Sequence, residues 1–119
     1  MTANNFIREF AIKIFSEAAR TENKLYYKVL NQDNDFTVEK LQDDYMLAWF
    51  LGEFSEKLPT GSLVEITEDN AAGFQCLYLI EDKYVLETVI YGIDCYDKLD
   101  WRFVEKKTKV VEITEWVEV

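Results

Sequence analysis

Apolar residues near the start of the chain recur with the period of an α-helix. Thr2, whose side chain suits a helix N-cap, precedes them, and the pattern continues to about Arg20. The polar side of this stripe is balanced in charge, which argues against a helix lying on an anionic membrane surface. The pattern therefore predicts a helix that packs on a core through Phe6, Ile7, Phe10, Ala11, Ile14, Phe15 and Ala18.

Two further elements precede a clear change of period. Lys24–Leu30, with the sequence KLYYKVL, is aromatic and β-branched and predicts a strand. Asn31–Asp35 has the composition of a turn. Val38–Lys57 then predicts a second helix, with Thr37 as its N-cap and Pro59 beyond its end. The middle of this segment is apolar almost all round, which predicts a deeply buried helix.

From Ser62 onward, apolar and polar residues alternate with the period of two that a half-buried β-strand requires. Short connectors at 69–73, 81–83 and 106–108 favour antiparallel hairpins, whereas Gly92–Asp100 predicts a longer polar loop. We expect a single α+β domain over residues 1–119, with two helices packed on one face of an antiparallel, mostly meander sheet of about five to six strands. A strongly bent sheet or a partial barrel is the alternative. The predicted strands cover residues 62–69, 73–80, 84–91, 101–106 and 109–119.

The composition is that of a globular protein, because 49% of the 119 residues are hydrophobic and 15% are aromatic. The chain opens without the basic and apolar pattern of a signal peptide, and no apolar run approaches the roughly 18 residues of a membrane span. The two cysteines, Cys76 and Cys95, are expected to be small, buried and reduced. These features predict a cytoplasmic protein.

Signatures of catalysis and metal binding are lacking. The chain has no histidine, which excludes Ser-His-Asp and Cys-His nucleophile systems. The four glycines form no phosphate-binding loop, and the two cysteines are too far apart for a zinc site. Asn31, Asp33 and Asp35 have the spacing of a calcium loop, but Phe36 and Gln42 stand where that loop needs glycine and glutamate. We therefore expect no enzymatic activity, no cofactor and no metal.

Charge is distributed unevenly along the chain. The net charge is −10, from 13 basic and 23 acidic residues. Residues 1–40 and residues 101–119 each carry equal numbers of basic and acidic side chains, whereas residues 41–100 carry three lysines and thirteen acids. The middle half of the chain therefore holds the whole imbalance. Such a segment repels nucleic acid and anionic membranes and attracts basic surfaces.

The pentapeptide VEITE occurs twice, at Val64–Glu68 and at Val111–Glu115. Strand alternation predicts that Val and Ile point inward and Glu and Thr outward in both copies. The residues after each copy differ, so we interpret the pair as two strands with one inside–outside pattern and not as an internal duplication. Only the first copy lies in the acidic segment. We therefore expect Glu65 and Glu68 to contact a partner in preference to the glutamates of the second copy.

A small acidic chain without catalytic residues resembles, in type, bacterial immunity proteins and phage-encoded inhibitors of host nucleases. We expect a stoichiometric inhibitor of a basic, nucleic-acid-binding protein, which acts by electrostatic masking or DNA mimicry and binds neither nucleic acid nor membrane itself. Aromatic side chains beside the acids are typical anchors of such interfaces. The candidate partner-binding residues are Asp43, Asp44, Glu53, Glu56, Glu65, Glu68, Asp69, Glu81, Asp82, Asp94, Tyr96, Asp97 and Asp100.

Two other functions are compatible with the sequence. The terminal segment, KVVEITEWVEV, is suited to form a sheet edge that pairs with a neighbouring chain in an assembly. A carboxylate-based binder of small ligands is the third hypothesis, and it requires a pocket in which acids with raised pKa converge. For the oligomeric state we expect a monomer or a homodimer.

Overall fold

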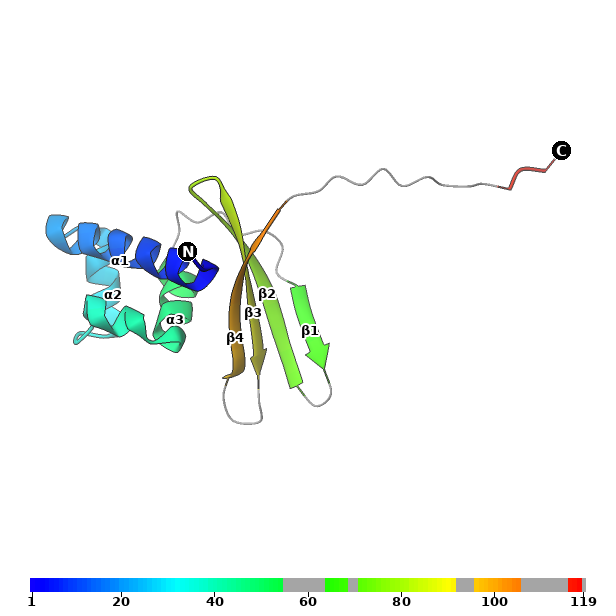
Figure 1. Ribbon diagram of the computed structural model, residues 1–119. Coiled ribbons are helices and arrows are strands. Elements are labelled where there is room, and N and C mark those ends of the chain that lie inside the picture. Colours follow the sequence, from blue (N-terminus) through cyan, green and yellow to red (C-terminus); the bar gives the residue numbers. More distant parts are fainter. Residues whose placement is uncertain (55–63, 69–70, 92–95, 106–115, 119) are drawn as a thin grey trace.

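The structure, a computed structural model, contains three α-helices, one 3-10 helix and a four-stranded antiparallel sheet within the residues that it describes. The helices form a layer on one side of the sheet (Figure 1). This arrangement confirms the α+β class. No helix in the described part of the chain is long and apolar enough to cross a membrane. The described residues are 1–54, 64–68, 71–91, 96–105 and 116–118, of which 64–68, 71–72 and 96–98 are described by their backbone alone.

Helix α1, Ala3–Thr21, confirms the first predicted helix. The Thr2 hydroxyl caps it by accepting a hydrogen bond from the Asn5 backbone N–H at 3.1 Å. The helix ends at Glu22, which adopts the left-handed conformation with φ 46°. Its buried face is Ala3, Ile7, Ala11, Phe15 and Ala18.

Helix α2, Lys24–Gln32, shows that the strand predicted for residues 24–30 is wrong. The side chain of Asn23 caps it, accepting from two first-turn N–H groups at 2.9 and 3.2 Å. The helix buries Val29 completely, and Tyr26 packs its ring against Phe15 of α1. Capping and this packing outweigh the strand preference of aromatic and β-branched residues, which is a weak and context-dependent bias.

The second predicted helix, 38–57, is interrupted. A 3-10 helix, η1, covers Val38–Gln42, and helix α3 covers Asp44–Phe54. Between them Asp43 is extended, with φ −81° and ψ 130°, and its side chain is free to cap α3. The prediction of burial is confirmed for one side of α3, which buries Leu47, Phe50, Leu51 and Phe54.

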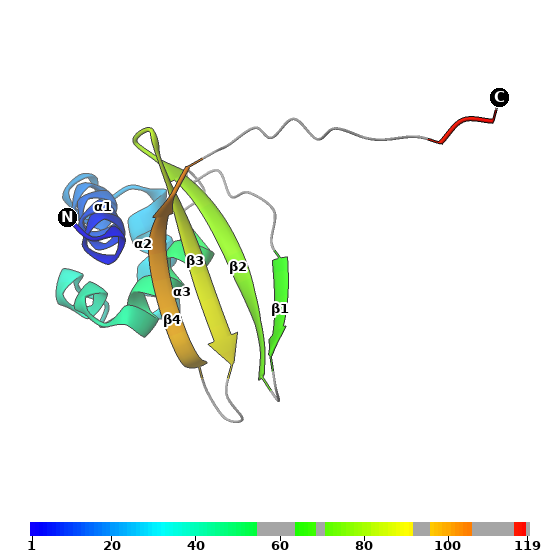
Figure 2. The same ribbon diagram turned by 45° about the vertical axis from the view of Figure 1, so that its right-hand side comes forward.

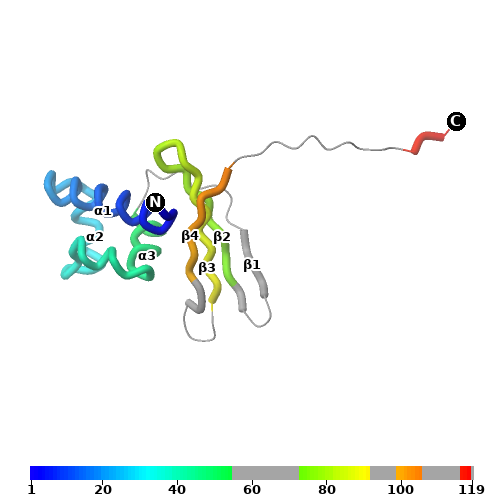
Figure 3. The backbone as a smooth tube through the Cα atoms, viewed as in Figure 1, coloured from blue at the N-terminus to red at the C-terminus, as the bar shows by residue number. Residues whose placement is uncertain are grey.

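The strands follow one another across the sheet in the order β1-β2-β3-β4, as Figure 3 traces, which confirms the meander. The described strands are fewer than the predicted five to six. The fourth begins at Tyr96, inside the stretch predicted as a polar loop, because its residues pair with β3. Of the predicted strand 109–119, only 116–118 are described, and they are not in a strand. The strands are β1 Val64–Glu68, β2 Ala71–Ile80, β3 Lys83–Tyr91 and β4 Tyr96–Val104.

The core lies between the helices and the upper part of the sheet (Figure 2). Tyr78 of β2 and Val85 of β3 are opposite one another in the register, and both are buried. Phe15 of α1 and Phe50 of α3 meet edge to face, with ring centroids 6.2 Å apart. One apolar cluster therefore joins the two layers.

Candidate functional site

Two of the predicted partner-binding acids, Asp43 and Asp44, lie where η1 meets α3. Oδ1 of Asp43 accepts hydrogen bonds from two N–H groups in the first turn of α3, at 2.9 and 3.0 Å. Asp44 forms an ion pair with Arg8 of α1, and the Nε of Arg8 also donates to the Leu41 carbonyl at 3.0 Å. Asp43 therefore caps α3, and Asp44 and Arg8 hold α3 and η1 against α1, in addition to any role of the two acids at the exposed surface.

Glu81 and Asp82 form the tip of the hairpin between β2 and β3. The two residues have φ values of 49° and 70°, so both adopt the left-handed conformation. Two-residue hairpin turns of type I′ need this conformation at both central positions, and glycine, asparagine and aspartate adopt it at lower cost than other residues. Both side chains are exposed. The chain thus places two acids at a position where the backbone alone would favour Asn-Gly.

Two lysines flank this tip. Lys13 of α1 reaches Glu81 with its Nζ 3.4 Å from Oε1, an exposed pair. The Nζ of Lys83 lies 5.8 Å from the ring centroid of Phe6 and 5.6 Å from that of Phe103. Lys83 is therefore held toward the rings at the junction of α1 and β4.

The other candidate acids are spread over both layers. Glu53 is exposed on α3. Asp100 lies on β4, where it accepts a hydrogen bond from Nε of Arg102 at 2.6 Å. The backbone alone is described for Glu65, Glu68, Tyr96 and Asp97, and outside the described residues lie Glu56, Asp69 and Asp94.

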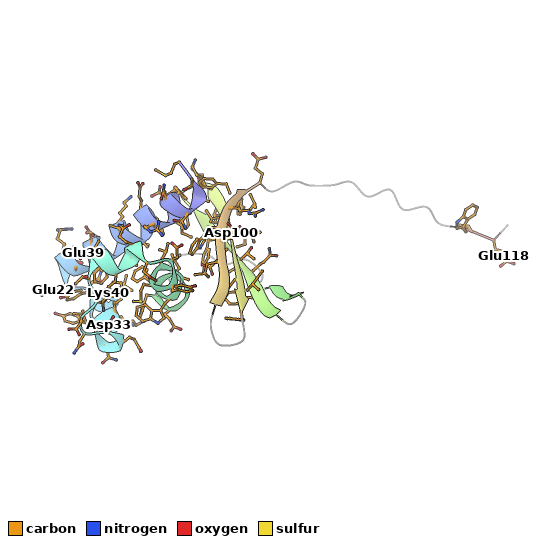
Figure 4. All side chains as sticks on the ribbon, turned by 60° about the horizontal axis from the view of Figure 1, so that its bottom comes forward. Glu22, Asp33, Glu39, Lys40, Asp100 and Glu118 are labelled. Carbon is orange, nitrogen blue, oxygen red and sulfur yellow. The ribbon has the colours of Figure 1, made fainter. Side chains whose placement is uncertain are left out.

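The described candidate acids lie on different sides of α1. Arg8 pairs with Asp44, and Lys13 pairs with Glu81. Five helical residues separate the two cations, which turns them about 140° apart around the axis. Figure 4 shows acids of the charge-balanced N-terminal segment, Asp33 among them, in the helical layer away from the sheet, whereas Asp100 lies on the sheet.

One acid that the sequence prediction missed, Glu87, lies inside the molecule. Its exposed fraction is 3%, and it is the one buried charged residue in the described part of the chain. Oε2 accepts a hydrogen bond from Nε1 of Trp101, opposite it on β4, at 2.9 Å. Glu87 shares its strand face with Val85 and Val89. An acid at the centre of an apolar alternating face was the signal in the sequence.

Burial changes the acid–base properties of this cluster. Burial raises the pKa of Glu87 to about 7, and the hydrogen bond from Trp101 acts in the opposite direction by lowering this pKa. Cys76, opposite Glu87 on β2, is the buried thiol that the sequence predicted, and burial raises its pKa. Burial also raises the pKa of Tyr78, with the charge of Glu87 adding to the effect. Cys76 and Tyr78 therefore stay protonated at neutral pH, whereas Glu87 changes its protonation state near pH 7.

This cluster fits a structural role better than catalysis. Its thiol is not activated, since a nucleophilic cysteine needs a lowered pKa. Within the described ranges, no group of three or more Cys, Asp or Glu side chains is arranged to hold a metal ion.

No family model, curated protein or solved structure matches this chain.

Proposed function

We propose that the protein is a small cytoplasmic, non-enzymatic binding module that inhibits a basic, nucleic-acid-binding protein by covering its nucleic-acid site. The observation that carries this proposal is the charge partition: residues 41–100 hold the entire net charge of −10. Self-repulsion of that size works against a compact fold, so it needs a compensating use. Attraction to a basic groove is such a use, and it speeds association.

The hairpin between β2 and β3 supports this proposal. Its tip presents Glu81 and Asp82 to solvent on a left-handed backbone, which costs about 1–2 kcal/mol at Glu81 and less at Asp82, because aspartate tolerates this conformation. The ion pair between Lys13 and Glu81 is exposed to solvent, so it stabilises the turn little and offsets little of that cost. Residues that destabilise a turn while adding charge are most simply explained by a requirement for that charge. We therefore place the hairpin tip at the centre of the proposed contact.

A displacement experiment tests the proposal. Proteins of the native host are loaded on a double-stranded DNA resin at low salt, and the purified protein is then added. We expect it to release one or a few basic proteins, which mass spectrometry identifies, whereas the same low-salt buffer without the protein releases none. No release at low salt beyond that of the buffer alone contradicts the proposal.

A pair of variants localises the contact. Glu81→Asn with Asp82→Gly removes two acids and supplies the preferred hairpin turn, so it should raise stability while it reduces release. Glu9→Gln with Glu39→Gln removes two exposed acids from the charge-balanced segment 1–40 and serves as the matched control. If both variants reduce release equally, the hairpin tip is not the centre of the contact.

A further inference from the structure

Strand β4 presents an open edge. Its residues 96–104 pair with residues 84–91 of β3, and no described strand pairs with the other side of β4. Such an edge carries a row of backbone N–H and C=O groups that readily accept a further strand. Helix α1 lies beside β4 (Figures 1 and 2), so a strand added there would lie in contact with the helical layer as well as with the sheet.

An aromatic ring at this edge, Phe103, is only partly covered by its neighbours. Phe103 lies on the helix-facing side of β4, on the same face as Trp101, two residues before it. Trp101 is only 5% exposed, whereas Phe103 is 42% exposed. Phe6 of α1 contacts the Phe103 ring, with centroids 5.4 Å apart, and so shields one side of it. The Nζ of Lys83 also lies 5.6 Å from the Phe103 ring centroid. A strand added to the edge would cover the part of the ring that Phe6 and Lys83 leave exposed.

The chain itself supplies a segment with matching chemistry. Residues 109–119, KVVEITEWVEV, alternate as a strand does, and Val111, Ile113 and Val117 fall on one face of it, which Glu115 interrupts. The described end of this segment is open to solvent: Trp116 is 96% exposed and Val117 is 79% exposed. Figure 1 shows residues 116–118 far from the sheet of their own chain. An exposed tryptophan beside apolar residues is typical of an interface anchor.

Charge favours this part of the chain for contact between two copies. Each copy carries a net charge of −10, so most approaches of two copies are repulsive. Residues 101–119 hold four basic and four acidic side chains and are neutral. A contact made by this segment is therefore less opposed by charge repulsion than a contact made by the acidic middle of the chain.

We propose that the open edge of β4 binds the C-terminal segment, residues 109–118, of a second copy as an added strand. That segment would turn Val111, Ile113 and Val117 toward Phe103 and the α1 layer, and would place Trp116 against the opposite face of the sheet. Reciprocal exchange of the two segments closes a symmetric dimer, because each copy gives one strand and receives one. The proposal does not depend on the proposed inhibitory function.

Sedimentation equilibrium across a range of concentrations tests it. The full-length protein should form a dimer, at twice the 14.1 kDa of the chain. Trp116→Ser changes a side chain that is 96% exposed, so it leaves the folded body intact; it should weaken the dimer about tenfold or more. Tyr27→Ser, at an exposed aromatic on α2, is the control and should leave the dimer unchanged. A monomer at every concentration, or equal effects of both variants, overturns the proposal.

Isotope mixing identifies which chain supplies the strand. A photo-crosslinking amino acid replaces Val117 in protein prepared separately with ¹⁴N and with ¹⁵N, and the two preparations are mixed before irradiation. We expect crosslinks from position 117 to β4 or α1 of the other isotopic form. Crosslinks confined to one isotopic form would show that the segment folds back on its own sheet, and would overturn the proposal. The test needs no partner protein, so its failure leaves the proposed function standing.

Discussion

Replacing Glu87 with glutamine should make the protein more stable at neutral and alkaline pH, because it removes a carboxyl group that is costly to ionise. Burial raises the pKa of Glu87 from 4.5 to about 7. The native state therefore keeps this proton to a higher pH than the unfolded state, and the free energy of unfolding falls as pH rises between those values. At about 1.4 kcal/mol for each pH unit, the total loss is about 3 kcal/mol.

Glu87→Gln should abolish this loss while its side-chain oxygen still accepts the Trp101 hydrogen bond. The assay is urea unfolding at several pH values from 4 to 9, followed by circular dichroism. We expect the variant to match the wild type near pH 4 and to exceed it by up to about 3 kcal/mol above pH 7. Glu9→Gln, at an exposed position on α1, is the control and should show no such divergence. A difference between Glu87→Gln and wild type that does not vary with pH would refute the reasoning.

Three further substitutions test particular contacts. Trp101→Phe removes the hydrogen bond that lowers the Glu87 pKa, so the pH-dependent loss of stability should extend further above pH 7 in the same assay; an unchanged profile would count against that bond. Asn23→Ala removes the cap of α2 and should lower the free energy of unfolding by about 1 kcal/mol, whereas no loss in urea unfolding would favour the predicted strand. Gly73→Ala brings a Cβ to 2.0 Å from the Val89 carbonyl oxygen and should cost about 1–3 kcal/mol in thermal unfolding, with an unaffected midpoint as the contradicting result.

Elements with a strong and unbroken period were predictable from the sequence. The apolar stripe of α1 recurs over the whole helix, and Thr2 marks its start. The hairpin turn at Glu81 and Asp82 lies between two alternating runs and was placed correctly. Segment 24–30 was assigned wrongly because its aromatic residues suit a strand locally, while in the fold Tyr26 packs against Phe15 of α1 and Val29 is buried. Packing of this kind depends on residues distant in the sequence, which local preference does not capture.

The candidate site was harder to predict, because a count of charges does not distinguish the uses of an acid. Asp43 and Asp44 counted toward the acidic surface, yet one caps α3 and the other pairs with Arg8. The break of the second helix at Asp43 arises from the same side chain, since an aspartate that caps the following turn interrupts the preceding one. Glu87 counted only toward the charge of segment 41–100, and its burial depends on the register that places it opposite Trp101.

The salt dependence of the association rate is the most direct test of the claim that the acidic segment 41–100 binds a basic partner. The measurement is stopped-flow association with a protein released from the DNA resin, over a series of ionic strengths. The proposed mechanism predicts a rate that falls steeply as salt increases, with a shallower dependence for Glu81→Asn with Asp82→Gly than for the Glu9→Gln, Glu39→Gln control. An association rate that is the same at low and high salt would contradict it.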